Sequence, residues 1–130
     1  MKMKRIIPIL ASTLLLLAGC SSKNTENNGY RQIDMEEAER IIKEEKEYII
    51  LDVRTPEEYK EGHIPQAINV PNETIGTQNV PELPDKNQLI LVYCRSGNRS
   101  KQAAGKLSKL GYDNILEFGG IIDWNGEIEK

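Results

Sequence analysis

The sequence predicts an α/β domain with a mostly parallel sheet, and three observations point to that class. The runs at residues 48–53 and 89–93 are almost continuously apolar, as in strands covered on both faces. Helix-start signals and helical stripes of apolar side chains alternate with these runs. The length of 130 residues allows one domain with a single core.

The first predicted helix begins at Asp34. Asp34 and Glu37 form an N-cap and N3 pair, and residues 38–42 carry apolar side chains at i, i+3 and i+4 spacing. Residues 48–53 follow as a central strand.

A second helix is predicted from Thr55, the N-cap, with Pro56 at the first helical position and Glu58 completing a capping box. Gly62 ends this helix. A short strand is then expected at residues 67–70.

Residues 71–88 hold several turn-forming residues and are predicted to be a loop with at most a short helix. The strongest strand signal, at residues 89–93, is followed directly by Cys94. An apolar stripe over residues 103–110 predicts a third helix that ends at Gly111.

The last elements are short. Residues 114–118 are predicted to form a final strand, which Gly119 and Gly120 are expected to break. Residues 121–124 follow as one more helical turn.

Composition excludes several classes of protein. The net charge is −3, and it is −6 without Lys2, Lys4 and Arg5, which argues against nucleic-acid binding. A mean hydropathy of −0.51 argues against a protein with several membrane spans. Two cysteines, Cys20 and Cys94, without a CxxC pair exclude a disulfide scaffold, a four-thiolate zinc site and a thioredoxin-type motif.

The beginning of the chain has the features of an export signal. Three cations precede residues 6–18, an uncharged and largely apolar stretch that is shorter than the roughly 20 residues of a spanning helix. Residues 17–20 (LAGC) resemble the lipobox of bacterial lipoproteins. The resemblance implies removal of residues 1–19 and lipid attachment at Cys20, so we expect an extracytoplasmic protein anchored to the cell membrane. An uncleaved signal anchor with an incidental cysteine is the alternative.

Residues 21–29 (SSKNTENNG) contain no apolar side chain. Such a segment adds nothing to a core, so residues 20–29 are predicted to be a lipidated, flexible tether. The folded domain is therefore expected at residues 30–130.

The loop after residues 89–93 is the predicted active site. Cys94 lies at the carboxyl end of a strand, where ligands bind in open α/β sheets. Gly97 permits a tight turn of backbone N–H groups, and the following helix contributes a partial positive charge. Arg95 and Arg99 add two cations, so the pattern predicts a thiolate and an anionic substrate. A small buried core cysteine is the alternative.

Several short segments occur in a characteristic order: 51–54 (LDVR), 58–59 (EY), 62–71 (GHIPQAINVP), 92–100 (VYCRSGNRS), 111–112 (GY) and 119–124 (GGIIDW). Together they resemble the single-domain rhodaneses, the thiosulfate-type sulfurtransferase family, over residues 30–130. Gln66 departs from the pattern, since the family usually has a small residue there. The resemblance implies a five-stranded sheet with helices on both faces.

The resemblance also implies a reaction. Cys94 would take a sulfane sulfur from thiosulfate or a low-molecular-weight persulfide and pass it to a thiol or cyanide. The substrate-binding residues would be Arg95, Ser96, Gly97, Asn98 and Arg99. We expect no metal or organic cofactor, no nucleic-acid partner and a monomer, with a protein as one form of sulfur acceptor.

Three other functions stay open at this point. A persulfide carrier or partner-binding module would use the same thiol without turnover. A Cys-based phosphatase or arsenate reductase is disfavoured, because phosphatases place the arginine six positions after the cysteine and Arg99 is five after Cys94. Redox sensing through Cys94 is disfavoured, because the mature chain offers no resolving cysteine.

Four further residues have a structural and a functional interpretation. Asp52 and Arg54 follow the central strand and would support the thiol loop, although a structural ion pair is favoured. His63 lies in a turn-like context, and a persulfide mechanism needs no base, so a structural role is favoured. Trp124 is expected in the core.

Overall fold

The computed structural model describes residues 29–76 and 78–130. The predicted signal peptide at residues 1–19, the lipid attachment at Cys20 and the tether up to residue 28 lie outside the described residues. Within the described part of the chain, no helix has both the length and the apolar character needed to cross a membrane.

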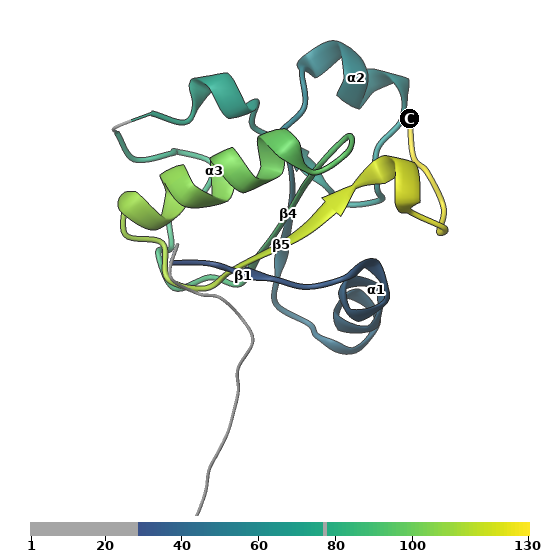
Figure 1. The fold of residues 1–130 in the computed structure, drawn as a ribbon, viewed down its shortest axis with the longest axis horizontal. Coiled ribbons are helices and arrows are strands. Elements are labelled where there is room, and N and C mark those ends of the chain that lie inside the picture. The colour runs from purple at the N-terminus through teal and green to yellow at the C-terminus, as the bar shows by residue number, and fades with distance from the viewer. Residues whose placement is uncertain (1–28, 77) are drawn as a thin grey trace, which may run out of the picture.

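A five-stranded sheet forms the centre of the domain, and all neighbouring strands run parallel (Figure 1). The strand order is β1-β5-β4-β2-β3. The strands are β1 (Arg31–Gln32), β2 (Ile49–Asp52), β3 (Ile68–Asn69), β4 (Ile90–Cys94) and β5 (Ile115–Gly120). The sheet confirms the predicted α/β class. The two residues of β1 are exposed, so this edge strand has no apolar pattern that would predict it.

Helices cover the sheet, and the two with a predicted capping motif begin where that motif predicts. Asp34 Oδ1 accepts a 2.9 Å hydrogen bond from the Glu37 N–H. Thr55 and Glu58 cap each other reciprocally, which confirms the predicted capping box. The helices are α1 (Met35–Glu44), α2 (Pro56–Glu61) and α3 (Asn98–Lys109), with 3₁₀ turns η2 (Asn72–Thr74) and η3 (Ile121–Asp123).

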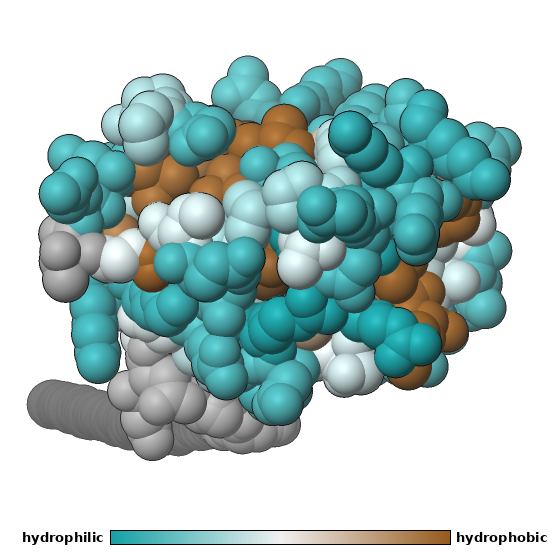
Figure 2. Space-filling model, turned by 90° about the horizontal axis from the view of Figure 1, so that it is seen from above, coloured by the Kyte–Doolittle hydropathy of each residue, from teal (hydrophilic) through white to brown (hydrophobic). Residues whose placement is uncertain are grey.

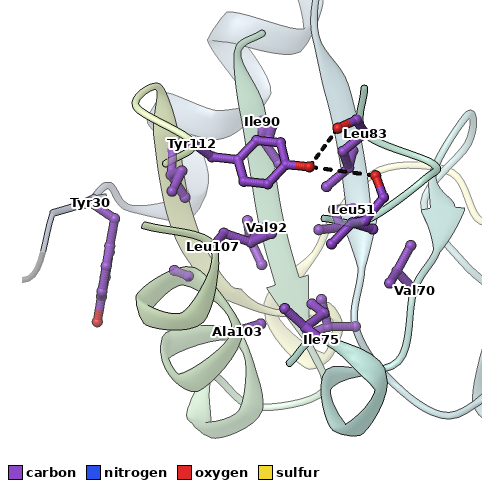
Figure 3. Close-up of a cluster of buried hydrophobic side chains, with 14 of the residues drawn as sticks. Tyr30, Leu51, Val70, Ile75, Leu83, Ile90, Val92, Ala103, Leu107 and Tyr112 are labelled. Carbon is purple, nitrogen blue, oxygen red and sulfur yellow. Dashed lines mark hydrogen bonds between the residues drawn. The ribbon is translucent and has the colours of Figure 1, made fainter. Parts of the chain in front are cut away.

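Each face of the sheet carries its own cluster of buried apolar side chains. One cluster lies against α3, and there the Tyr112 hydroxyl donates to the Leu83 carbonyl at 2.5 Å and to the Val80 carbonyl at 3.5 Å (Figure 3). The second cluster includes Ala38 and Ile41 of α1. Successive residues of β4 alternate between the clusters, and all five are buried. Helices therefore lie on both faces, as predicted.

The prediction that Gly119 and Gly120 break the last strand is wrong. β5 runs through both glycines, and Gly120 pairs with Cys94 after an irregularity in the β4–β5 register. A Cβ atom on Gly120 would lie 1.9 Å from the Arg95 carbonyl oxygen. Gly120 thus allows the backbones of β5 and the loop after β4 to approach closely, which a strand propensity does not reveal.

The end of the chain returns to the turn between α2 and β3. The His63 N–H donates to the Glu129 carbonyl at 2.9 Å, and the Glu129 N–H donates to the His63 carbonyl at 2.8 Å. The imidazole stacks on the Tyr59 ring, with 3.8 Å between centroids. These contacts agree with a structural role for His63.

Figure 2 shows the molecule from above, turned by 90° about the horizontal axis of Figure 1. On this face most of the surface is hydrophilic, and hydrophobic residues lie in separate patches. Among the described residues, the large apolar side chains that are most exposed are Ile122 and Ile128. Trp124 is half-buried against the second cluster, and its Nε1 donates to the Glu127 carbonyl at 2.9 Å.

Candidate active site

Cys94 lies at the carboxyl end of the central strand β4, with 1% of the residue exposed. Its sulfur accepts a hydrogen bond of 3.0 Å from the Gly97 N–H. The sulfur also lies 3.5 Å from Ser100 Oγ, in the first turns of α3. The loop therefore directs polar hydrogen-bonding groups at a thiol that is otherwise shielded from water.

Two opposing effects set the acidity of Cys94. Burial alone raises the pKa of the thiol, because desolvation disfavours the charged form. Hydrogen bonds from the Ser100 hydroxyl and from backbone N–H groups favour the thiolate and bring the pKa below its usual value. These N–H groups belong to Ser96, Gly97 and Ser100.

The backbone at Gly97 makes this arrangement feasible. Gly97 has a φ of +110°, a left-handed conformation that side chains disfavour, and it precedes the first residue of α3. The positive end of the helix dipole therefore lies beside the sulfur. Because Gly120 on β5 has no side chain, the backbone of Arg95 lies close to this strand. The Ile122 N–H donates to the Arg95 carbonyl at 3.2 Å.

Arg99, predicted to bind substrate, is engaged by a carboxylate. Its guanidinium donates to both oxygens of Glu58 on α2, at 2.8 and 3.1 Å. The Arg99 hydrogen bonds hold the pKa of Glu58 at about 2. The pKa of Arg99 is raised, mainly by Glu58 and to a smaller extent by the charge of Cys94. Arg99 is thus near the sulfur, but its closest anion is Glu58.

The remaining loop side chains face outward. Arg95, Ser96 and Asn98 are exposed. Within residues 29–76 and 78–130, the Arg95 guanidinium forms no hydrogen bond or ion pair, which leaves it available to an incoming anion. The hydrogen bonds that favour the thiolate therefore come from amides and a hydroxyl, whereas the sequence also predicted a contribution from the cations Arg95 and Arg99.

Asp52 and Arg54 lie on the other face of the sheet, in a buried polar network. Arg54 donates to Asp52 Oδ2 at 2.7 Å and to the Gly62 carbonyl at 2.7 Å. The Tyr93 hydroxyl donates to the same carboxylate at 2.7 Å and accepts from the Ile64 N–H at 3.1 Å. The pair joins β2, β4 and the end of α2, and within the described part of the chain none of its hydrogen bonds reaches the sulfur of Cys94.

Glu117 is a site residue that the sequence analysis missed. It lies on β5 with 2% of the residue exposed, and its Oε2 atom accepts from the Ser100 hydroxyl and, at 3.0 Å, from the Gly119 N–H. The sequence carried one signal for this residue, a glutamate between the core residues Leu116 and Phe118 of a strand. Because side chains alternate along a strand, Glu117 faces the opposite side of the sheet, toward α3.

The hydrogen-bond donors around the Cys94 sulfur lie at the carboxyl ends of the strands. A hollow of about 680 Å³, lined by Arg31, Leu89 and Asn114, lies instead at the amino ends, away from Cys94. Among the described residues, no group of three or more His, Cys, Asp or Glu side chains is placed to hold a metal ion. The candidate nucleophile is the Cys94 thiol, which has amide donors around it.

Comparisons with known proteins identify the family of the domain. A family described as Rhodanese-like domain matches residues 34–127. The thiosulfate sulfurtransferase PspE of Escherichia coli is 40% identical over 73 residues, which cover 56% of this chain and 70% of PspE. A sulfurtransferase of Allochromatium vinosum is 37% identical over 94 residues, covering 72% of this chain and 86% of the relative.

Two further matches broaden the comparison. The putative sulfur carrier protein YrkF of Bacillus subtilis is 32% identical over 99 residues, or 75% of this chain and 52% of YrkF. A solved structure of a rhodanese with anions from E. coli has a TM-score of 0.59 and 36% identity, covering 64% of this chain and 98% of that one. The fold, the thiol loop and these matches together show that the chain belongs to the rhodanese family, with a single rhodanese-like domain.

Proposed function

We propose that the protein is a sulfurtransferase that carries a sulfane sulfur on Cys94, from thiosulfate or a persulfide donor to a thiol or cyanide. The observation that carries the proposal is the set of hydrogen-bond donors around the Cys94 sulfur, which lowers the pKa of the thiol. A thiolate is the nucleophile that sulfur transfer requires.

The first step forms the persulfide. The Cys94 thiolate attacks the outer sulfur of thiosulfate, a new S–S bond forms, and the original S–S bond breaks with its electron pair leaving on sulfite. The outer sulfur then carries the negative charge at the mouth of the loop. Loop N–H groups and the helix dipole stabilise that charge.

The second step regenerates the thiolate. A thiolate or cyanide attacks the outer sulfur of the persulfide, and the Cys94 sulfur leaves with the bonding electrons. No proton has to be supplied in either step, because the attacking and leaving groups are anions. Arg95, exposed and unpaired within the described residues, supplies a cation for the approach of either anion.

The test is formation of thiocyanate from thiosulfate and cyanide by the purified protein. Cys94→Ser is expected to abolish turnover, whereas Cys20→Ser is the matched control and should retain it. Wild-type protein that forms no persulfide with thiosulfate, glutathione persulfide or 3-mercaptopyruvate would refute the proposal.

A sulfur carrier is the second candidate, and a specific observation favours it. Cys94 is almost fully buried, and Arg99 is already bound by Glu58. Both features favour retention of a bound sulfur over rapid exchange. Mass spectrometry separates the two functions: a stable mass increase of one sulfur atom with negligible thiocyanate formation identifies a carrier.

We further propose that the domain is held at a membrane through lipid on Cys20, outside the cytoplasm. The support is the sequence of residues 17–20 and the polar segment that follows. Cys20→Ser should move the protein from the membrane fraction to the soluble fraction and remove labelling by a palmitate analogue. Unchanged labelling would contradict lipid attachment at this residue.

A further inference from the structure

An ion pair beside the reactive thiol joins the thiol loop to a neighbouring helix. Arg99, in the first turn of α3, donates from both terminal nitrogens to the two oxygens of Glu58 on α2, at 2.8 and 3.1 Å. The charge of Cys94 also acts on the Arg99 guanidinium and contributes to its raised pKa. Because this interaction is mutual, a change in the charge of the Arg99–Glu58 pair is felt at the sulfur.

The Glu58 carboxylate is held in place from its own helix. Its Oε1 atom accepts from the Thr55 N–H at 3.0 Å and from the Thr55 hydroxyl at 3.1 Å. The same hydroxyl accepts from the Glu58 N–H at 3.2 Å, which completes the capping box. The start of α2 therefore presents a fixed carboxylate to the planar guanidinium, in the two-point geometry that arginine prefers.

The thiol loop has as many anionic as cationic groups around it. The cations on residues 94–101 are Arg95, Arg99 and Lys101. The anions are the thiolate and the carboxylates hydrogen-bonded to this segment, which are Cys94, Glu58 and Glu117. Removal of the charge of one carboxylate would therefore leave the surroundings of the sulfur with an excess of positive charge.

The three cations differ in what opposes them. Glu58 neutralises Arg99 directly, whereas Arg95 and Lys101 have no carboxylate partner within residues 29–76 and 78–130. Lys101 Nζ donates to the Gly97 carbonyl at 3.2 Å, and Arg95 is exposed. The Arg99 and Glu58 side chains are 33% and 27% exposed, so an incoming anion reaches Arg99 but has to compete with Glu58 for it.

Sulfur donors differ in the charge that they bring to such a site. Thiosulfate is a dianion at neutral pH, whereas a persulfide brings a single negative charge at its reacting end, or none when it is protonated. The attraction between a substrate and a charged site grows with the product of the two charges. Surroundings with balanced charge therefore favour a dianion less than surroundings with an excess of positive charge would.

We propose that Glu58 is a specificity-determining residue: by neutralising Arg99, it lowers the preference of the site for dianionic sulfur donors, such as thiosulfate, relative to persulfides. The consequence for turnover rests on the proposed sulfurtransferase function. The charge selectivity of Cys94 itself is a property of the protein toward any reagent, so it is tested without a sulfur donor.

The test is alkylation of Cys94 by iodoacetate and by iodoacetamide, in the Cys20→Ser protein. Both reagents lose iodide to the thiolate and are similar in size, but iodoacetate is an anion and iodoacetamide is neutral. The ratio of the two rate constants cancels the fraction of thiolate, which both reactions share. It therefore reports the charge around the sulfur.

Glu58→Gln should raise the ratio of iodoacetate to iodoacetamide rates by about threefold or more at low ionic strength. The increase should shrink at high salt, which screens charges and which a purely structural effect would not follow. Glutamine at this helix position accepts from the N-cap N–H as glutamate does, so the capping box is kept. Glu57→Gln, exposed and adjacent on α2, is the matched control and should keep the wild-type ratio. An unchanged ratio in Glu58→Gln overturns the proposal, as does an equal rise in Glu57→Gln.

Arg99→Gln tests the same interaction from the other partner. It should lower the ratio below the wild-type value, because the charge of Glu58 is then unopposed. The double variant Arg99→Gln with Glu58→Gln should return the ratio toward wild type. A double variant that stays at the ratio of Arg99→Gln overturns the proposal, because Glu58 then does not act on the charge at the sulfur.

In turnover, Glu58→Gln should lower the KM for thiosulfate more than it changes kcat, and Glu57→Gln should change neither. An unchanged KM for thiosulfate in an active Glu58→Gln protein overturns the role of Glu58 in specificity. If the wild-type protein forms no thiocyanate, the proposed function is refuted, and the alkylation ratios alone decide whether Glu58 sets the charge selectivity of Cys94.

Discussion

Two buried carboxyl groups lie on opposite faces of the same sheet, and they differ in their hydrogen-bond and ion-pair partners. Asp52, fully buried, binds the Arg54 guanidinium and the Tyr93 hydroxyl. Glu117, nearly as buried, binds a serine hydroxyl and a backbone N–H and has no ion-pair partner among the described residues. The first carboxylate has a fixed counter-ion, whereas the second is connected to the reactive thiol.

The difference in partners corresponds to a difference in the role of each carboxyl group. A buried ion pair with its remaining hydrogen bonds satisfied holds neighbouring elements in one geometry. Burial and Asp52 raise the pKa of Tyr93, so this phenol stays protonated and keeps donating. Glu117, linked to a hydroxyl and an amide group, has no such counter-ion among the described residues.

The largest expected effect comes from removing the counter-ion of Asp52. Arg54→Met should lower the free energy of unfolding by about 3–5 kcal/mol, because it leaves a buried charge without a partner. Urea denaturation followed by circular dichroism measures the change. Arg40→Met, in an exposed ion pair, is the control and should have a much smaller effect on stability, because water screens such pairs.

The double variant Asp52→Asn with Arg54→Met sharpens this prediction. Both charges are then absent, so a substantial part of the lost stability should return. If the double variant is as unstable as the sum of the two single variants, the Asp52–Arg54 pair is not the source of the effect.

A smaller effect is expected from the serine that connects Glu117 to the thiol. Ser100→Ala removes a hydroxyl that favours the thiolate, so the pKa of Cys94 should rise. The thiolate fraction at neutral pH should fall by up to about tenfold. Sulfur transfer should recover as pH rises, which a purely structural defect would not produce.

Alkylation rates of Cys94 as a function of pH measure this shift. Ser108→Ala, also on α3, serves as the control and should keep the wild-type profile. An identical profile for Ser100→Ala and wild type would mean that the hydroxyl does not act on the sulfur.

The smallest effect concerns Glu58, the carboxylate that binds Arg99. Its pKa is about 2 in the folded protein, below the usual value of 4.5, because Arg99 hydrogen bonds to it. The stabilisation of the fold by the Glu58–Arg99 pair is therefore present above about pH 4.5 and is lost as pH falls toward 2. Because both side chains are partly exposed, we expect about 1 kcal/mol.

Urea denaturation between pH 2 and 6 tests this, with Glu58→Gln expected to lose part of the pH dependence and exposed Glu57→Gln to keep it. Equal acid sensitivity of wild type and Glu58→Gln would show that the Arg99 contact does not stabilise the fold.

Local features of the sequence predicted most of the fold. The capping pairs that begin at Asp34 and Thr55 span three residues, so they can be recognised in the sequence. The structure confirms both. The run at residues 89–93 predicted the central strand and placed Cys94 at its end. β1 escaped prediction because two exposed residues carry no pattern, and Gly120 was misjudged because its close contact is with the Arg95 backbone.

The candidate site could be predicted only where its residues are close together in the sequence. The loop from Cys94 to Ser100 lies on one short segment, so its amides were predictable from a strand followed by a helix. The partner of Arg99 is Glu58, separated by 41 positions, and the partner of Ser100 is Glu117, separated by 17. Such pairings depend on how α2, α3 and β5 come together, and no spacing in the sequence encodes them.

The parallel direction of β1 and β5 has a consequence for orientation. Residue 31 pairs with residue 116 in the same direction, so the chain enters the domain at the amino ends of the strands. Cys94 lies at the opposite, carboxyl ends. The first described residues and the thiol loop therefore lie at opposite ends of the sheet, so a contact made through one end leaves the other uncovered.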